Sequence, residues 1–180
     1  MTVGVKKAVV GMTLSVIGAG CVIPLAFWAL SSTLDAAFRF GPLLGPPLAQ
    51  MLAAAFILIG AFWISWAYSY LLFVGKGLPL ELFGRALHPT KFLVTTGPYA
   101  YSRNPVILGI LFVLLGVACL TRSVSGLALV PILAIVSGLY LSFFEEKGLV
   151  ARFGAEYEEY RGNVPLIVPR FTPYIHETAR

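Results

Sequence analysis

Two short polar clusters stand at the ends of two successive apolar stretches. Arg103, Asn104 and Pro105 come just before one stretch, and Glu145 and Glu146 come directly after the next. If the two stretches form a helical hairpin, both clusters return to the same end of it. The arrangement therefore predicts a site built from one cation, one helix start and two carboxylates.

The first cluster has the features of a helix start that can hold an anion. Asn104 is a favourable N-cap residue, and Pro105 suits the first helical turn. The unpaired N–H groups and the positive end of the helix dipole would lie beside Arg103, and together they suit a carboxylate. A membrane helix with an ordinary cap and a neighbouring arginine has the same pattern, so this cluster alone leaves both interpretations open.

The second cluster places two carboxylates at a membrane boundary. Burying one costs about 2.5–3.5 kcal/mol at the centre of a membrane helix and less near its ends. Glu145 and Glu146 can accept hydrogen bonds from hydroxyl groups or from an ammonium of a polar ligand. Alternatively both reach water, or one pairs with Arg103. Adjacent helix positions point about 100° apart, so the two need not share one role.

The elements that must position these residues are membrane-spanning helices. Of 180 residues, 58% are hydrophobic and only 12% are charged, which is typical of an integral membrane protein. The predicted fold class is all-α: a polytopic membrane protein with four transmembrane helices, both termini cytoplasmic, and a C-terminal interfacial amphipathic helix. The predicted single domain, 1–180, has spans at about 8–34, 48–74, 104–120 and 124–145, a cytoplasmic loop at 75–103 and a C-terminal cytoplasmic segment at 146–180.

The distribution of positive charge predicts the orientation. All but two of the 13 Lys and Arg residues fall on one side of the predicted spans, and only Arg39 and Arg122 fall on the other. The positive-inside rule makes the first side cytoplasmic. It also explains the net charge of +5 without a nucleic acid partner, and we expect none.

An amphipathic pattern follows the two glutamates. Apolar or aromatic residues recur every three or four positions, at Leu149, Phe153, Tyr157 and Tyr160. This spacing predicts a helical segment on the inner membrane surface, which Gly154 is placed to break.

Read together, these motifs resemble the superfamily of isoprenylcysteine carboxyl methyltransferases and phospholipid methyltransferases. The matching pieces are G-P-Y-A-Y-S-R-N-P-V-I-L-G at 97–109, E-E-K-G-L at 145–149, F-G-A-E-Y-E-E-Y at 153–160 and V-P at 164–165. The resemblance covers roughly residues 75 to 170. It departs from the family pattern at Asn104, where the prenylcysteine enzymes have histidine, and at Ile107, where tyrosine is usual.

The resemblance implies a methyltransferase that depends on S-adenosylmethionine, with no metal and no assigned catalytic residue. Its acceptor would be lipophilic: an isoprenylcysteine carboxylate, a phospholipid amine or a thiol. The cofactor-binding residues carried over from the family are Arg103, Asn104, Pro105, Gly109, Glu145, Glu146, Tyr157 and Tyr160. A non-enzymatic four-span scaffold and a nicotinamide-dependent membrane reductase are the alternatives, and the oligomeric state is left open.

Overall fold

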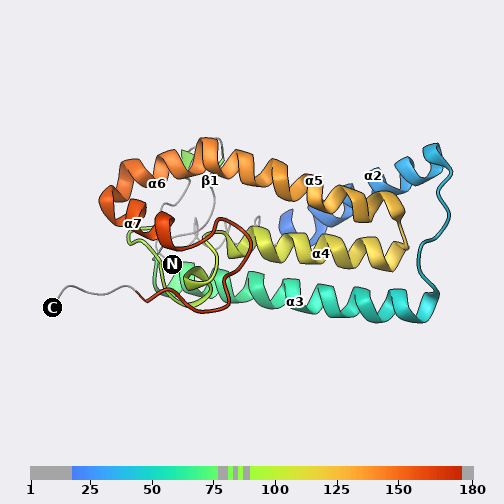
Figure 1. Cartoon of the computed structure of the whole chain (residues 1–180), viewed down its shortest axis with the longest axis horizontal. Helices are drawn as coiled ribbons and strands as arrows, with labels where there is room; N and C mark the ends of the chain where they lie inside the picture. Colours follow the sequence, from blue (N-terminus) through green and yellow to red (C-terminus); the bar gives the residue numbers. More distant parts are fainter. Residues whose placement is uncertain (1–17, 77–80, 83–84, 87–89, 176–180) are drawn as a thin grey trace, which may run out of the picture.

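The apolar stretches form a bundle of long helices that lie side by side (Figure 1). The computed structural model describes residues 18–76, 81–82, 85–86 and 90–175. Its helices are η1 (Gly18–Val22), α2 (Ile23–Phe38), α3 (Pro46–Phe73), η2 (Gly97–Ala100), α4 (Pro105–Thr121), α5 (Val124–Tyr140), η3 (Leu141–Glu145), α6 (Glu146–Phe153) and α7 (Ala155–Asn163). Two short strands, β1 (Glu81–Leu82) and β2 (Arg85–Ala86), pair antiparallel in the loop after α3.

The fold is therefore helical as predicted, apart from this two-stranded ladder, but several boundaries differ. The first span reaches Phe38, four residues beyond its predicted end, and the turn before α3 is correspondingly shorter. Its predicted start at residue 8 lies outside the described residues. The fourth span passes without interruption through η3 into α6, so one continuous helix runs to Phe153 where an end at 145 was predicted. Apolar residues continue to Phe144, and the helix passes through Gly148 and ends only before Gly154.

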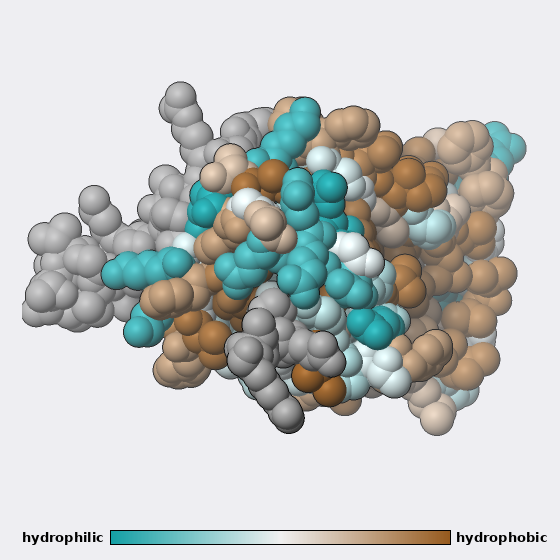
Figure 2. Space-filling view, turned by 60° about the vertical axis from the view of Figure 1, so that its left-hand side comes forward, coloured by the Kyte–Doolittle hydropathy of each residue, from teal (hydrophilic) through white to brown (hydrophobic). Residues whose placement is uncertain are grey.

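Three of the described helices are long and apolar enough to cross a membrane: Gly20–Phe38, Pro46–Phe73 and Val124–Phe153. α4, with 17 residues, is apolar but shorter. Hydrophobic side chains cover the bundle, and hydrophilic ones gather at one end (Figure 2). The molecule is thus a membrane protein with one polar end.

α3 and α4 are packed closely because small residues face each other between them. A Cβ atom built on Gly60 of α3 would lie 2.5 Å from the carbonyl oxygen of Gly109 in α4. A Cβ built on Gly109 would lie 2.8 Å from the carbonyl oxygen of Gly60. Only glycine allows the two backbones to approach this far, as is common between membrane helices.

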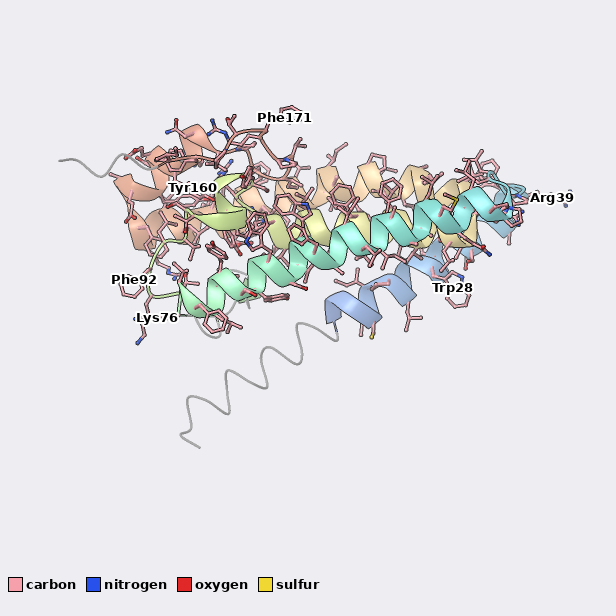
Figure 3. The ribbon with its side chains drawn as sticks, turned by 90° about the horizontal axis from the view of Figure 1, so that it is seen from below. Trp28, Arg39, Lys76, Phe92, Tyr160 and Phe171 are labelled. Atoms are coloured by element: carbon pink, nitrogen blue, oxygen red, sulfur yellow. The ribbon has the colours of Figure 1, made fainter. Side chains whose placement is uncertain are left out.

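The turns between the helices lie at the end of the bundle opposite the polar end. Arg122 adopts a left-handed conformation with φ 58° and ends α4, and the Ser123 hydroxyl caps α5 by accepting from Gly126 N at 2.8 Å. Asp35 at the end of α2 accepts from Ser125 N at 2.9 Å. Arg39 therefore lies at the end remote from Lys76 and Tyr160 (Figure 3).

At the polar end, the chain turns back at Gly154. This residue has φ 54° and ψ −130°, a conformation that residues with a side chain rarely adopt. It separates α6 from α7 at the position where the sequence predicted a break. α7 then ends at Asn163, and residues 164–175 form an irregular segment that is hydrogen-bonded to the residues before α4, which we call the C-terminal strap.

Candidate functional site

A cavity of about 260 Å³ lies at the polar end. Its walls come from the ends of α3, α4 and α5, from η2, η3, α6 and α7, and from the loop after the strands. The lining residues are Leu71, Thr90, Leu93, Val94, Tyr99, Arg103, Asn104, Pro105, Val106, Ile107, Tyr140, Leu141, Glu145, Leu149, Arg152, Phe153, Tyr157 and Tyr160. Residues far apart in the sequence thus meet around one hollow, as the two polar clusters predicted.

Six of the eight residues predicted to bind a cofactor line this cavity, and two do not. The six are Arg103, Asn104, Pro105, Glu145, Tyr157 and Tyr160. Gly109 lies one turn into α4, against Ile64 and the Gly60 carbonyl of α3, so the structure places it in the helix packing. Glu146 points to the other side of its helix and lines a separate groove.

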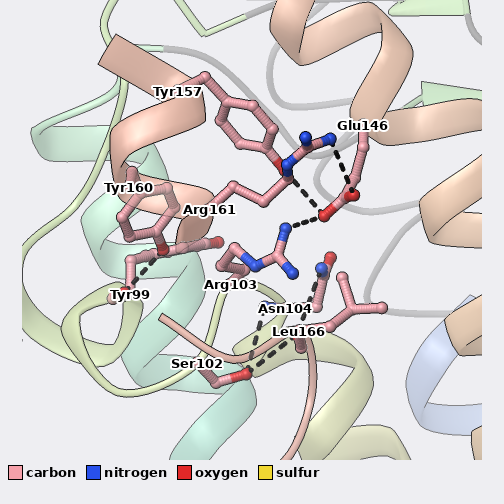
Figure 4. A network of polar contacts seen from close by, with 9 residues as sticks. All are labelled: Tyr99, Ser102, Arg103, Asn104, Glu146, Tyr157, Tyr160, Arg161 and Leu166. Carbon is pink, nitrogen blue, oxygen red and sulfur yellow. Dashed lines mark hydrogen bonds and ion pairs between the residues drawn. The ribbon is translucent and has the colours of Figure 1, made fainter. Parts of the chain in front are cut away.

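Glu146 is the centre of a polar network (Figure 4). Its Oε1 atom pairs with Arg103 Nη1 and accepts a hydrogen bond from the Tyr157 hydroxyl at 3.2 Å. Its Oε2 atom lies 3.9 Å from Nη1 of Arg161. The Arg103 and Glu146 side chains are only 11% and 9% exposed, so each needs its partner. Glu146 therefore holds Arg103 in place at the cavity wall.

Arg103 retains unused hydrogen-bonding capacity. Its Nε atom is buried and has no partner among the described residues. Burial lowers the pKa of the guanidinium, and the nearby Arg161 cation lowers it further. Because arginine stays protonated in proteins, its positive charge lies at the cavity wall. An anionic group of a ligand in the cavity would be attracted to this charge.

The two adjacent glutamates have different environments. Glu145 lines the cavity and is half-buried, whereas Glu146 is buried and bound to protein cations. They lie where η3, a single π-helical turn, passes into α6. Such turns are frequent at functional sites, where they change the direction of side chains. The expectation that the pair need not share one role agrees with this geometry.

The C-terminal strap is joined to the start of α4 by hydrogen bonds. The Arg103 N–H donates to the Pro165 carbonyl at 2.9 Å, and the Ser102 hydroxyl donates to the Ile167 carbonyl at 2.9 Å. Ser102 is completely buried. Asn104 occupies the N-cap position of α4, but no side-chain capping bond forms, which contradicts the predicted cap. Its Nδ2 atom donates to the Leu166 carbonyl at 3.4 Å, because the strap offers an acceptor there.

The two tyrosines of α7 form part of the cavity wall. Tyr157 and Tyr160 are 2% and 3% exposed and pack with Val164. The Tyr160 hydroxyl donates to the Tyr99 carbonyl at 2.7 Å. Burial raises the pKa of Tyr157 to about 12, and it also raises the pKa of Tyr160. Both side chains are therefore neutral hydrogen-bond donors at physiological pH.

Comparison with known proteins places this architecture in a family. The model of the phospholipid methyltransferase family matches residues 48–156, which is more than half of the chain. This chain belongs to that family. The match begins near the start of α3, so it also includes a span that lies before the resemblance at residues 75 to 170. It ends just before Tyr157, and so it covers every wall of the cavity except α7.

One curated relative of this family member is methanethiol S-methyltransferase 2 of Bradyrhizobium diazoefficiens. The two chains are 31% identical over 126 residues, which cover 65% of this chain and 47% of the relative. The chain thus matches about half the length of that relative. No solved structure matches this chain. Family and relative together indicate a methyltransferase.

Sequence reasoning missed several residues of the cavity wall. Tyr99 stands in the quoted G-P-Y piece, but nothing in that piece marked it as a wall residue. Arg152 stands between the apolar positions Leu149 and Phe153 of the amphipathic pattern, yet it lines the cavity and donates to the Thr90 carbonyl. This contact connects α6 to the loop that carries Leu93 and Val94. The 3.6-residue period could have placed Arg152 and Phe153 beside Leu149, but no local signal identifies Thr90 as the acceptor.

Proposed function

We propose that this membrane methyltransferase uses S-adenosylmethionine and transfers its methyl group to a lipophilic or thiol acceptor at the cytoplasmic face. The supporting observation is the cavity itself, in which the family-matched helices and α7 gather two cations, one helix start and one carboxylate around about 260 Å³. This volume is close to the lower end of the range for small-molecule sites, roughly 300 Å³ upward.

The residues present suit this cofactor. Arg103, which lines the cavity, and the start of α4 would hold a carboxylate. Glu145 would accept hydrogen bonds from hydroxyl groups or from an ammonium. Leu93, Val94 and Phe153 supply an apolar wall for a ring. When bound, S-adenosylmethionine supplies a methyl group on a positively charged sulfur.

In such a reaction the protein acts by positioning the two reactants. Aligning two reactants for an in-line displacement can lower a barrier by about 7–11 kcal/mol. A thiolate or carboxylate acceptor requires no general base, whereas an ammonium must first lose a proton. We propose that the acceptor enters from the bilayer between α4 and α5, where Ile107 and Tyr140 line the cavity and Tyr140 is 37% exposed.

The orientation is part of the proposal. We propose four spans, with α4 as the short third one, and with the polar end and both termini in the cytoplasm. Arg39 and Arg122 lie at the far end of the bundle, while Arg103, Lys147 and Arg152 lie at the polar end. Cysteines at Gly162 and Gly41, introduced after replacing the two native cysteines, should react with an impermeant maleimide from opposite sides of the membrane.

Calorimetry with S-adenosylhomocysteine, on purified protein in mild detergent, tests cofactor use. We expect saturable binding to the native protein and at least tenfold weaker binding to Glu145→Gln. Glu156→Gln, which changes an exposed glutamate of α7 outside the cavity, should bind like the native protein. No binding to the native protein, together with binding of a nicotinamide dinucleotide, would overturn the proposal in favour of a reductase.

An acceptor panel with S-adenosylmethionine labelled in its methyl group identifies the substrate class. The panel should include a small alkyl thiol, a phosphatidylethanolamine and a prenylated cysteine analogue. Transfer to one class, lost in Arg103→Gln and retained in Glu156→Gln, is the expected result.

A further inference from the structure

A second hollow, a groove of about 380 Å³, lies between α6 and α7 and shares no lining residue with the first cavity. Its walls are Ser142, Glu146, Lys147, Val150, Ala151, Glu158 and Arg161. Glu146 belongs to this groove, while its neighbour Glu145 belongs to the first cavity. The methyl-transfer proposal assigns no role to the groove, and the following inference does not depend on that proposal.

The cations of the groove have hydrogen-bond donors to spare. Lys147 is exposed and forms no ion pair with any described residue. Arg161 reaches Glu146 only at 3.9 Å, the outer limit of an ion pair, and its side chain is 46% exposed. Glu146 is already satisfied by Arg103 and by the Tyr157 hydroxyl. An anion in the groove would therefore meet two available cations.

The groove lies where the apolar surface of the bundle ends. Large exposed apolar side chains continue along α5 and η3 as far as Phe143 and Phe144, which are 59% and 55% exposed. Lys147 is the first cation after them. A helix that crosses a bilayer presents such a change from apolar to cationic residues at the level of the lipid headgroups.

An apolar track leads from the bilayer to the groove on the same helix. Leu139 and Ile135 lie three and seven residues before Ser142, spacings that put them near the same helix face. They are 53% and 64% exposed. A ligand with an anionic head and hydrocarbon chains would match both parts, whereas a free phosphate would use the groove alone.

We propose that this groove binds the phosphate of a membrane phospholipid, with Lys147 and Arg161 as its cationic contacts and Ser142 as a hydrogen-bond donor. The lipid chains lie along Leu139 and Ile135. Glu158 is three residues before Arg161 on α7 and contributes the one negative charge of the groove that is not paired with a described cation. It limits the affinity for a strongly anionic head.

Native mass spectrometry of the purified full chain in mild detergent provides the test. The probes are a short-chain phosphatidylglycerol, glycerol phosphate without acyl chains, and inorganic phosphate. We expect one retained phosphatidylglycerol, with at least fivefold less retention in the Lys147→Gln/Arg161→Gln double variant. The control variant, Arg39→Gln/Lys76→Gln, removes the same charge from exposed residues outside the groove and should retain the lipid.

Two further variants refine the test. The single variant Arg161→Lys, in which Lys147 is native, keeps both positive charges and should retain more lipid than the double variant. Glu158→Gln should increase retention, because it removes a negative charge from the groove. Equal retention in the double variant and the control would overturn the site, and glycerol phosphate or inorganic phosphate binding as tightly as the lipid would overturn the lipid as its ligand.

Discussion

The α3–α4 seam and the polar end are held together by opposite means. In the seam, Gly60 and Gly109 let two backbones touch, and the side chains nearest to them are the apolar ones of Ile64 and Val113. At the polar end, an ion pair and hydrogen bonds join α4, α6, α7 and the strap, as Arg103, Glu146 and Tyr157 illustrate.

The difference follows from the solvent around each region. Lipid chains give little hydrophobic drive for helices to associate, so close van der Waals packing stabilises the seam. The polar end lies beside water, where its segments need specific partners to stay in one arrangement. The seam supplies a rigid support, and the polar network sets the position of the cavity wall upon it.

The largest effect is expected from Glu146→Ala in the network. It leaves the Arg103 cation buried without its partner, and breaking a buried ion pair typically costs about 3–5 kcal/mol. Thermal unfolding in detergent should show a large fall in the midpoint, and S-adenosylhomocysteine binding should weaken because Arg103 is no longer held.

Two controls separate the network from general charge effects. Glu156→Ala, at an exposed position of α7, should leave both measurements unchanged. Arg103→Met/Glu146→Met, which removes both charges, should recover much of the stability but not the ligand binding. If Glu146→Ala unfolds at the native midpoint, the network does not support the polar end.

The second-largest effect on stability is expected from Gly60→Ala in the α3–α4 seam. The new Cβ would lie 2.5 Å from the Gly109 carbonyl oxygen and 2.9 Å from Val113 N, which are backbone atoms that cannot rotate away. Overpacking of this kind costs about 1–3 kcal/mol. We expect a lower unfolding midpoint and a lower yield in membranes.

Gly148→Ala is the matched control, because no heavy atom lies within 4 Å of the Cβ that it adds to α6. It should be neutral or slightly stabilising, since alanine favours a helix over glycine by roughly 0.5–1 kcal/mol. A similar midpoint for both variants would show that α3 and α4 tolerate separation.

Most of the bundle could be predicted from the sequence because its signals are local. Uninterrupted apolar runs identified the long helices, Pro105 marked the start of α4, and Gly154 marked the break before α7. The continuation of the fourth span to Phe153 could not be predicted, because residues after Glu145 are compatible with helix in either a span or a surface segment. The partner of Gly109 was equally hidden, since a glycine inside a motif does not reveal which backbone approaches it.

Of the candidate site, only the proximity of its oppositely charged residues could be predicted from the sequence. Arg103 and the glutamates were expected at one level, and the ion pair of Arg103 with Glu146 was among the alternatives. Which glutamate faces the cavity depends on the π-helical turn of η3, and no residue type encodes that turn. The bonds from Ser102 and Asn104 to the strap join residues more than sixty positions apart, as their separations of 65 and 62 show.

Ser102→Ala tests that connection with a smaller expected effect. It removes the bond to the Ile167 carbonyl and the acceptor for Asn104 N at 3.2 Å. The cost of buried polar groups left without partners is about 1–3 kcal/mol. Hydrogen exchange should increase in the strap and at the start of α4, while α3 keeps its protection. Ser65→Ala, in which an exposed intrahelical bond is lost, is the control and should leave the strap unchanged.

The smallest effect at neutral pH, and one that depends on pH, is expected from Tyr157→Phe. It removes the 3.2 Å hydrogen bond to Glu146. A hydrogen bond of this kind contributes only about 0.5–1.5 kcal/mol to stability, so the loss is modest. Burial raises the folded-state pKa of Tyr157 to about 12, whereas the unfolded value is the ordinary 10.0. The unfolded state therefore loses this proton first, so the stabilising contribution is complete below pH 10 and disappears as the pH rises through about 12. The native unfolding midpoint should fall more steeply than that of Tyr157→Phe between these values, and parallel curves for the two proteins would show that Tyr157 is not held in the buried position described here.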